Sequence, residues 1–262
     1  MVRALLTHRY LIAAVFAGLL LQACGVARAS EPHYFEPDGI GHNYVVVGGD
    51  TLSVSFLPTD ESLRHGRLSE HDFEEVAAEL GVEVAAIKAV TDIEAGRTHE
   101  GFWSEGKPLI NFDLGVYRAR AARRGVNLKK YARSHSVIFN RPNTARYGSQ
   151  QAAQQARLDA AMSIDSVSAI EGTFWGMFQI GGFNYARCGA KNHSEFVRLM
   201  SRSERDQLEL FAAFIRNAGL LPALQRKDWR AFARGYNGPS YASRGYHTRL
   251  ASSYAKHAKK QK

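Results

Sequence analysis

Signals that start and stop helices recur along the chain from residue 69 onward, and this pattern restricts the fold more than any other feature. Ser69 and Asp72 open an apolar segment that Gly81 ends, and later segments carry similar boundaries. Segments with the alternation of half-buried strands are scarce. We therefore predict a mainly α-helical body over residues 68–257, with helices at 73–80, 82–94, 114–124, 150–170, 174–180, 203–217, 228–236 and 243–257.

The residues on either side of this body lack its helix signals. Residues 30–67 contain three prolines and many turn formers, so we predict a short irregular leader. Within it, residues 44–53 predict either a pair of strands or a strand and a turn. They resemble the opening of a LysM wall-binding module, whose later elements are not found afterwards. Residues 258–262 form a basic tail.

The first 29 residues have the order of a secretory signal peptide. Arg3 and Arg9 precede an uncharged apolar run at 11–21, and Ala27 and Ala29 stand before a cleavage site. The run is shorter than the roughly 20 residues that a membrane-spanning helix needs. We therefore expect an exported protein of the periplasm or cell envelope.

The two cysteines, Cys24 and Cys188, are not expected to form a disulfide with each other. Leu-Gln-Ala-Cys at 21–24 resembles a lipobox, so lipoprotein processing before Cys24 and ordinary cleavage after Ala29 are alternatives. A lipidated Cys24 would attach the chain to a membrane. In both cases Cys188 has no disulfide partner, so the hydrophobic core must stabilise the domain. The histidines lack metal-ligand spacing, and we expect neither metal nor cofactor.

The net charge of +9 predicts a polyanionic partner. Residues 1–29 contribute three arginines and no acidic residue, so the charge without them is +6. Outside the cytoplasm nucleic acid is a poor partner, which leaves the anionic cell-wall polymer or a membrane surface. The sequence carries no signal for the oligomeric state.

One carboxylate stands out at the end of an apolar helix. In the helix expected at 82–94, Ile87, Val90 and Glu94 lie on one stripe, which places the Glu94 carboxyl at the edge of the core. Apolar neighbours raise a carboxyl pKa, as a general acid requires. The alternative is a helix-terminal glutamate that bends out to solvent.

Three segments resemble motifs of the N-acetylmuramidase domain of bacterial and phage endolysins. Residues 89–97 resemble its helix end V-x-x-x-E-S-G-G, residues 175–184 its W-G-x-F-Q-I-M-G-x-N segment, and residues 232–241 its F-A-x-x-Y-N-G-P-x-Y segment. They occur in the family's order and cover residues 68–256. The resemblance implies a lysozyme-like helical domain with a sugar-binding cleft, related more distantly to goose-type lysozymes and soluble lytic transglycosylases.

The same resemblance implies roles for individual residues. Glu94 matches the general acid that protonates the β-1,4 bond between N-acetylmuramic acid and N-acetylglucosamine in peptidoglycan. A turn and a loop then face one another across the cleft, and a tyrosine hydroxyl of the loop can orient the acid. Trp175 is expected in the core. The substrate-binding residues implied are Gly176, Phe178, Gln179, Tyr236 and Asn237.

Glycoside hydrolysis usually calls for a second carboxylate. Residues 107–113 resemble the family segment P-x-I-L-F-E-x-H, with Asp113 in place of its glutamate and no histidine following. Ala95 is a second departure, since the family generally has serine there. Other candidates for the second carboxylate are Asp92, Asp165 and Glu171.

Three functions are therefore considered. The first is a muramidase that hydrolyses peptidoglycan with Glu94 and Asp113 as catalytic residues. The second is a lytic transglycosylase, which needs one carboxylate and leaves 1,6-anhydromuramyl ends. The third is a peptidoglycan-binding protein without turnover, suggested by Ala95 and Asp113.

Overall fold

The computed structural model describes residues 43–47, 50–54, 67–96 and 100–260. The chain forms two units, Met1–Phe56 and Leu57–Lys262. In the first, β1 (Asn43–Val47) and β2 (Asp50–Val54) pair in antiparallel register, which is one of the two arrangements expected for residues 44–53. The expected signal peptide, the lipobox at Cys24 and the rest of the leader lie outside the described residues, apart from residue 67.

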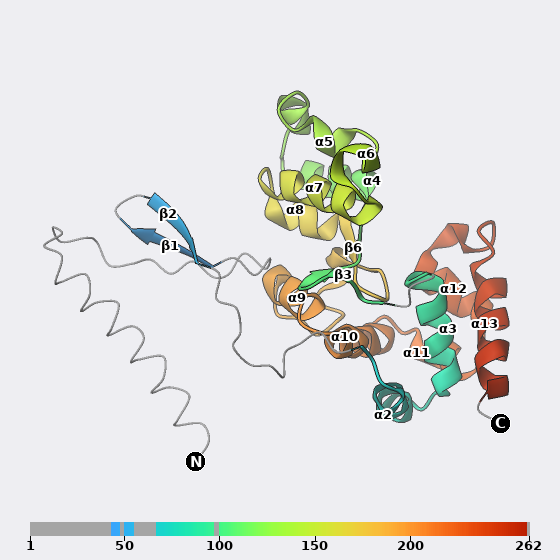
Figure 1. Ribbon diagram of the computed structural model, residues 1–262. Helices are drawn as coiled ribbons and strands as arrows, with labels where there is room; N and C mark the ends of the chain where they lie inside the picture. The colour runs from blue at the N-terminus through green and yellow to red at the C-terminus, as the bar shows by residue number, and fades with distance from the viewer. Residues whose placement is uncertain (1–42, 48–49, 55–66, 97–99, 261–262) are drawn as a thin grey trace, which may run out of the picture. The chain divides into compact units, whose positions relative to one another are not determined.

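The second unit is mainly helical, as predicted (Figure 1). Short strands are placed between the helices: β3 (Phe102–Ser104), β4 (Lys107–Pro108), β5 (Ile110–Phe112), β6 (Thr173–Trp175) and β7 (Ile180–Gly181). Three short 3-10 helices are η2 (Leu128–Tyr131), η3 (Gly182–Asn184) and η4 (Pro239–Tyr241). The α-helices are α2 (Glu70–Leu80), α3 (Val84–Glu94), α4 (Leu114–Arg123), α5 (Ser136–Phe139), α6 (Thr144–Tyr147), α7 (Gln150–Met162), α8 (Ser166–Glu171), α9 (His193–Met200), α10 (Glu204–Asn217), α11 (Leu221–Gln225), α12 (Trp229–Asn237) and α13 (Tyr246–Lys260).

The boundary signals of α2 act as the sequence predicts. The Ser69 hydroxyl accepts a hydrogen bond from the Asp72 backbone N–H, and the Asp72 carboxylate accepts one from the Ser69 N–H. Gly81 ends the helix at φ +62°, where its N–H reaches the carbonyls of Ala77 and Ala78. The helix begins three residues before the predicted start.

The prediction of one helix over residues 150–170 is wrong, because α7 ends at Met162 and α8 begins at Ser166. The Asp165 carboxylate accepts a hydrogen bond from the Ser168 N–H at 2.7 Å and caps a new helix. The alanine and glutamine content predicted continuity, and this capping signal overrode it.

The prediction of a helix at 174–180 is also wrong. These residues belong mostly to β6, β7 and the turn between them, with Trp175 opposite Ile180, and β5 completes a three-stranded sheet. Gly176 has φ +70° and Gln179 has φ +46°, both outside the right-handed helical region. The apolar composition was compatible with either structure, and the left-handed turn decides between them.

Several short helices were not predicted. Between α4 and α7 the chain forms η2, α5 and α6, each of four residues. Helices of that length are too short for a 3.6-residue periodicity to be visible. The eight residues of α9 have a cap signal that could have been noticed, since the Asn192 side chain accepts a hydrogen bond from the Glu195 N–H at 2.8 Å.

The core of the second unit includes one face of α10. Leu208, Phe211 and Ile215 are fully buried there, and the ring of Phe178 stacks on Phe211 with centroids 4.2 Å apart. Trp175 is buried, as predicted, and its indole N–H donates to the Ile170 carbonyl. The turn between β6 and β7 therefore rests directly on α10.

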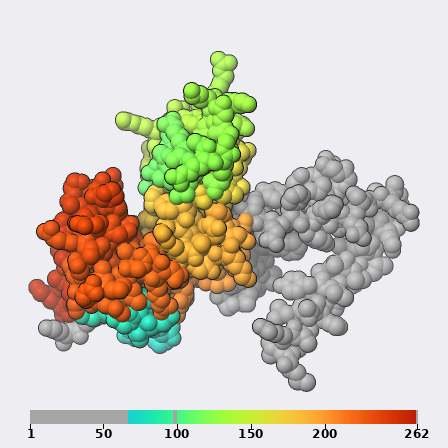
Figure 2. All heavy atoms as spheres, turned by 180° about the vertical axis from the view of Figure 1, so that it is seen from behind, coloured from blue at the N-terminus to red at the C-terminus, as the bar shows by residue number. Residues whose placement is uncertain are grey.

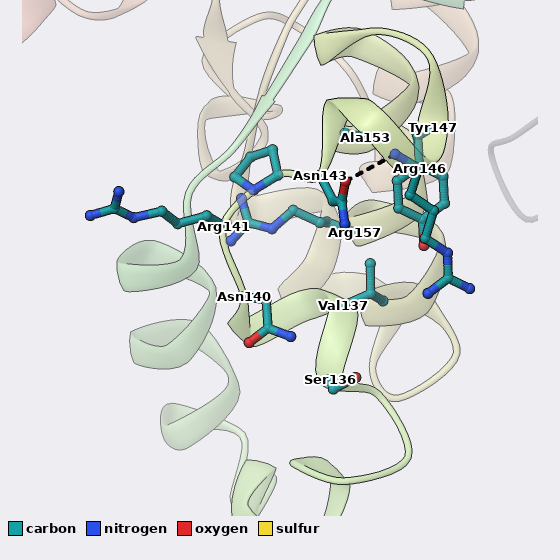
Figure 3. A pocket seen from close by; sticks show the side chains of 10 residues that line it. Ser136, Val137, Asn140, Arg141, Asn143, Arg146, Tyr147, Ala153 and Arg157 are labelled. Atoms are coloured by element: carbon teal, nitrogen blue, oxygen red, sulfur yellow. Dashed lines mark hydrogen bonds between the residues drawn. The ribbon is translucent and has the colours of Figure 1, made fainter.

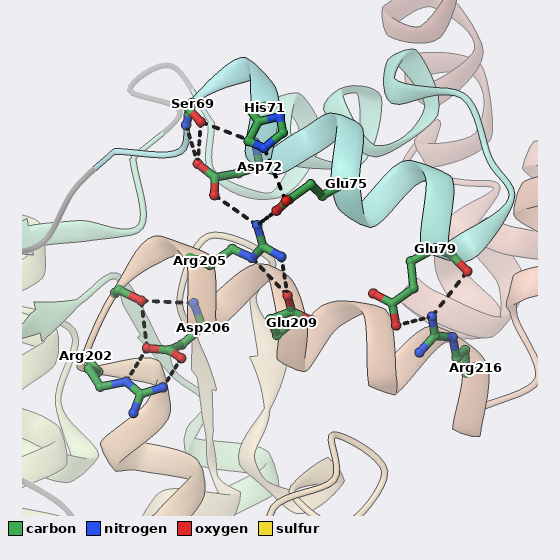
Figure 4. A network of polar contacts seen from close by, with 11 residues as sticks. Ser69, His71, Asp72, Glu75, Glu79, Arg202, Arg205, Asp206, Glu209 and Arg216 are labelled. Atoms are coloured by element: carbon green, nitrogen blue, oxygen red, sulfur yellow. Dashed lines mark hydrogen bonds and ion pairs between the residues drawn. The ribbon is translucent and has the colours of Figure 1, made fainter. Parts of the chain in front are cut away.

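Ion pairs connect the exposed side of α10 to α2. Arg205 lies between Asp72 and Glu75 of α2 and also contacts Glu209 on its own helix (Figure 4). Surface pairs of this kind contribute little singly, but a network that shares one guanidinium fixes the two helices in register.

Helix α13 packs along α3 and α12, and Figure 2 shows the teal segment of α2 and α3 against the red C-terminal segment. Asp92 of α3 accepts hydrogen bonds from the Ser253 hydroxyl and from His257 Nε2 at 2.9 Å. At the start of α3, Glu83 accepts one from the Tyr254 hydroxyl at 2.6 Å. Since α13 extends to Lys260, the predicted basic tail begins within this helix.

Cys188 is buried, and burial raises the pKa of its thiol to about 12. The thiol therefore stays protonated and unreactive at neutral pH. Within the residues that the structure describes, none of the helices has the length and apolarity needed to cross a bilayer.

Gly182→Ala should destabilise the second unit by about 3 kcal/mol, because the added Cβ overpacks against backbone. It would lie 2.1 Å from the Ile170 carbonyl oxygen, which cannot move aside without breaking α8. Urea unfolding followed by circular dichroism measures the loss. Gly219→Ala meets no atom within 4 Å and has only a left-handed backbone to strain, so it should cost about 1 kcal/mol. Equal losses in the two variants would contradict the steric argument.

Candidate active site

Glu94 is the last residue of α3 and is half-buried. Its Oε1 accepts a hydrogen bond from the side-chain amide of Asn237, at the end of α12, over 2.8 Å. Val90, one turn before Glu94, is buried in the core, as the apolar stripe predicted. The helix therefore carries this carboxyl from the core to the C-terminal end of α12.

The environment of Glu94 makes its carboxyl a weaker acid than that of an exposed glutamate. Burial raises the pKa of its carboxyl from 4.5 to about 7, and the Asn237 hydrogen bond and the positive charge of Arg249 offset only part of that effect. At neutral pH the protonated and ionised forms of the carboxyl are thus both populated. A carboxyl with this property can donate a proton and take it back under the same conditions.

The turn between β6 and β7 is held by hydrogen bonds to and from its backbone. The Gln179 side-chain amide donates to the Gly176 carbonyl at 2.9 Å, and the Gly176 N–H donates to the Leu109 carbonyl at 2.7 Å. A Cβ on Gly176 would lie 2.8 Å from the Gln207 side chain. Glycine is required here by the left-handed φ and by this close approach.

Gln207 of α10 holds this turn from below, and sequence reasoning did not identify it. It is fully buried, and its Oε1 accepts from the Met177 N–H at 2.7 Å. Its Nε2 donates to the carbonyls of Met200 and Gly101. The available signal was a polar residue four positions before Phe211, on the mainly apolar buried face of α10.

Tyr236 does not orient the Glu94 carboxyl, contrary to the prediction. Its hydroxyl donates instead to the Phe178 carbonyl at 2.6 Å, and a hydroxyl has one proton to give. Burial, with the nearby charge of Glu94, keeps the pKa of Tyr236 well above its usual value. The residue that contacts the carboxyl is its neighbour Asn237.

Phe178 contributes its backbone to the site, while its ring is enclosed. The ring is 1% exposed and packs on Phe211. Phe178 was expected among the substrate-binding residues, and its buried ring leaves only its backbone for such a role. Gln179 is half-buried, and beyond its bond to Gly176 it retains one N–H and its Oε1 for a ligand.

Asp113 acts as the N-cap of α4. Its Oδ1 accepts a hydrogen bond from the Val116 N–H at 2.9 Å, and the residue is half-buried after β5. This capping role accounts for an aspartate at the position without reference to catalysis. No contact joins Asp113 to Glu94 among the described residues.

The other candidate carboxylates are also engaged. Asp92 binds α13, and Asp165 caps α8. Glu171 is buried among Arg120, Arg124 and His193. Burial alone would raise its pKa, but hydrogen bonds from Arg124 and His193 and the arginine charges hold it below the usual value. Glu171 is thus an ionised structural group.

The described part of the chain contains no group of three histidine, cysteine or acidic residues arranged to hold a metal ion. The indole N–H of Trp103 in β3 is buried and has no hydrogen-bond acceptor among the described residues. The ammonium of Lys107 lies 5.4 Å from the centre of its ring.

A helical domain with one weakly acidic carboxyl at a helix end is consistent with a glycosidase, and comparison with known proteins supports this class. The profile of the N-acetylmuramidase family matches residues 83–258. Among solved structures, the chain is similar to the crystal structure of the Burkholderia AP3 phage endolysin. The two share 30% sequence identity with a TM-score of 0.60, over 78% of this chain and 74% of that chain. No curated protein matches it.

Since the family profile covers more than half of the sequence, this chain belongs to the N-acetylmuramidase family. The family resemblance predicted from the three motifs is confirmed. The protein is a glycoside hydrolase that acts on peptidoglycan.

Glu94→Gln should make the folded chain more stable above pH 7. The carboxyl ionises near pH 4.5 when unfolded and near pH 7 when folded, so the folded state binds the proton more tightly. The resulting cost of ionisation, about 3 kcal/mol, is absent below pH 4.5, grows as the pH rises, and is complete above pH 7. Glutamine avoids it and still accepts from Asn237.

Unfolding by urea at pH 4.5 and pH 8 measures this difference between the variant and the wild type. Glu105→Gln removes an exposed carboxylate in the β3–β4 turn and serves as the control. A gain for Glu94→Gln that does not change with pH would contradict the assigned environment.

Proposed function

We propose that Glu94 is the general acid of this muramidase and protonates the oxygen of the β-1,4 bond between N-acetylmuramic acid and N-acetylglucosamine. The observation that carries the proposal is its half-buried carboxyl, with a pKa of about 7, at the end of α3. The match to the N-acetylmuramidase family over residues 83–258, a range that includes Glu94, gives further support.

The contact with Asn237 determines which oxygen of Glu94 bears the proton. Asn237 donates to Oε1, so the acidic proton is favoured on Oε2, which is free to face the glycosidic oxygen. When the proton leaves, the same hydrogen bond strengthens onto the carboxylate. Asn237 thereby favours proton transfer, while burial of Glu94 keeps the proton available beforehand.

Tyr236 connects the two halves of the proposed substrate site. Its hydroxyl fixes the end of α12 to the backbone of the turn that carries Gln179. Gln179 then offers an amide donor and acceptor to an N-acetyl or hydroxyl group of the sugar. Gly176 allows this turn to lie close to α10.

In the hydrolytic reaction, water attacks the anomeric carbon as the protonated leaving sugar departs, and a reducing end results. We propose Asp113 as the group that assists this water. One observation favours a second reaction, lytic transglycosylation: Asp113, Asp92, Asp165 and Glu171 all have structural partners. Attack by the muramyl 6-hydroxyl, which gives a 1,6-anhydro ring, can proceed with Glu94 alone.

Glu94→Gln should lower the rate of peptidoglycan cleavage by at least about 100-fold, because the variant has no proton to donate. Activity of the wild type should fall as the pH rises above about 7, where Glu94 loses its proton. Release of soluble fragments from purified sacculi measures both effects. Full activity in the variant would contradict the assignment, and wild-type protein that binds sacculi without turnover would support a non-catalytic role.

Asp113→Asn tests the second carboxylate without disturbing α4, because asparagine is an equally good N-cap. If Asp113 assists water, the variant should lose about 100-fold in rate while its thermal unfolding is unchanged. Retained activity would exclude that role. Mass spectrometry of the fragments then identifies the reaction: reducing ends indicate hydrolysis, and 1,6-anhydro ends indicate transglycosylation.

We further propose that the protein is exported to the periplasm or cell envelope, where its substrate lies. The order of basic, apolar and small residues in positions 1–29 supports this location. Lipidation of Cys24 would anchor the chain to a membrane, and cleavage after Ala29 would release it.

A further inference from the structure

A small polar pocket lies at the junction of α5, α6 and α7 (Figure 3). Its volume is about 110 Å³, and its lining includes Arg141, Arg146 and Arg157 together with the amides of Asn140 and Asn143. No acidic residue lines it. Pockets for drug-sized ligands usually measure at least about 300 Å³, so this pocket suits a smaller group.

Arg157 of α7 is the buried base of this pocket, being 6% exposed. Its hydrogen bonds go to uncharged oxygens: twice to the Ile138 carbonyl, once to the Phe112 carbonyl and once to the Gln154 amide. These use four of the five guanidinium N–H groups. Among the described residues, Arg157 has no ion pair with a carboxylate, although Asp113 exerts an electrostatic effect on it.

The segment around the pocket is free of acidic residues. Residues 114–158 contain ten arginines and lysines and neither aspartate nor glutamate. Within this segment, Arg120 and Arg124 share an ion pair with Glu171, which lies outside it. Arg141 and Arg146, in contrast, have exposed side chains that extend outward in Figure 3 and make no ion pair with a described residue. The field at the pocket is therefore positive and only partly offset by Asp113.

We propose that this pocket binds a carboxylate group of the peptide stems of peptidoglycan. A buried guanidinium without a paired carboxylate is unfavourable, because Asp113 acts on Arg157 without forming an ion pair with it, and a carboxylate ligand in the pocket would supply that pair. The pocket is large enough for a carboxylate and a few attached atoms, and Asn140 and Asn143 offer polar groups at its rim. This inference rests on the proposed function in one respect, because peptidoglycan is taken as the polymer that carries the carboxylate.

This pocket would form a second contact with the polymer, at a place separate from the site of cleavage. Glu94 and the turn that carries Gln179 are proposed to bind the sugar chain, whereas the pocket would bind a stem. The stem carboxylate then determines which substrates are retained, and a glycan strand without stems would lose this contact.

The test places a negative charge at the rim of the pocket. Asn143 is the N-cap of α6 and Asn127 is the N-cap of η2, and each side chain accepts a backbone N–H bond. Aspartate preserves both caps. Asn143→Asp and Asn127→Asp therefore make the same change within the same basic segment, but only Asn143 lines the pocket.

The binding assay uses the full chain with Glu94→Gln as background, so that no ligand is consumed. The probe is a soluble disaccharide-peptide with free stem carboxylates, compared with its fully amidated form and with inorganic phosphate. Titration calorimetry gives the dissociation constants. Asn143→Asp should weaken binding of the acidic probe by at least about fivefold and Asn127→Asp by less than about twofold, because like charges repel most at short range.

Equal weakening in the two variants would overturn the proposal and indicate diffuse attraction by the basic segment. Equal binding of the amidated probe, or tighter binding of phosphate than of the acidic probe, would also overturn it. Because binding is measured without turnover, these results are independent of whether Glu94 is the acid. Asn143→Asp in an otherwise wild-type chain should still cleave glycan strands that lack stems.

Discussion

The buried amide of Gln207 is the contact on which the arrangement of the site depends. This side chain receives the N–H of Met177 and binds the carbonyls of Met200 and Gly101. It therefore joins the turn between β6 and β7, the end of α9 and the segment before β3 to α10. Glu204, nearly one helical turn earlier, accepts the N–H groups of Leu68 and Gly101 in the same way. Breaking any of these buried hydrogen bonds would leave a polar group without a partner, which is costly. The bonds therefore hold the backbone segments around the site in one arrangement.

Glu94 is held between two opposing influences. Burial favours its neutral form, and the Asn237 hydrogen bond with the charge of Arg249 favours its ionised form. The result is a carboxyl whose two states are close in free energy at neutral pH, which is the condition for efficient proton transfer. The folded chain accepts a local loss of stability at this position, as enzymes commonly do at their active sites.

The sequence predicted elements with long periodicity or explicit caps, such as α2, α3 and α10, and the position of Glu94 on its stripe. It failed where two signals competed. Asp165 divided the predicted helix at 150–170, and the left-handed residues Gly176 and Gln179 replaced a helix with a hairpin. The motif located Asn237 and Tyr236 but not which of them contacts Glu94, because adjacent residues at the end of one helix point in different directions. Gln207 escaped notice because its partners are backbone groups distant in sequence.

The Asn237 contact with Glu94 spans 143 residues of sequence, and α13, which packs along the same helix, comes later still. During synthesis, α3 therefore leaves the ribosome long before the groups that complete its surroundings. Until they arrive, Glu94 is solvated and behaves as an ordinary, fully ionised glutamate at neutral pH. Glu94 therefore acquires its raised pKa only after the C-terminal helices have been made and have packed around it.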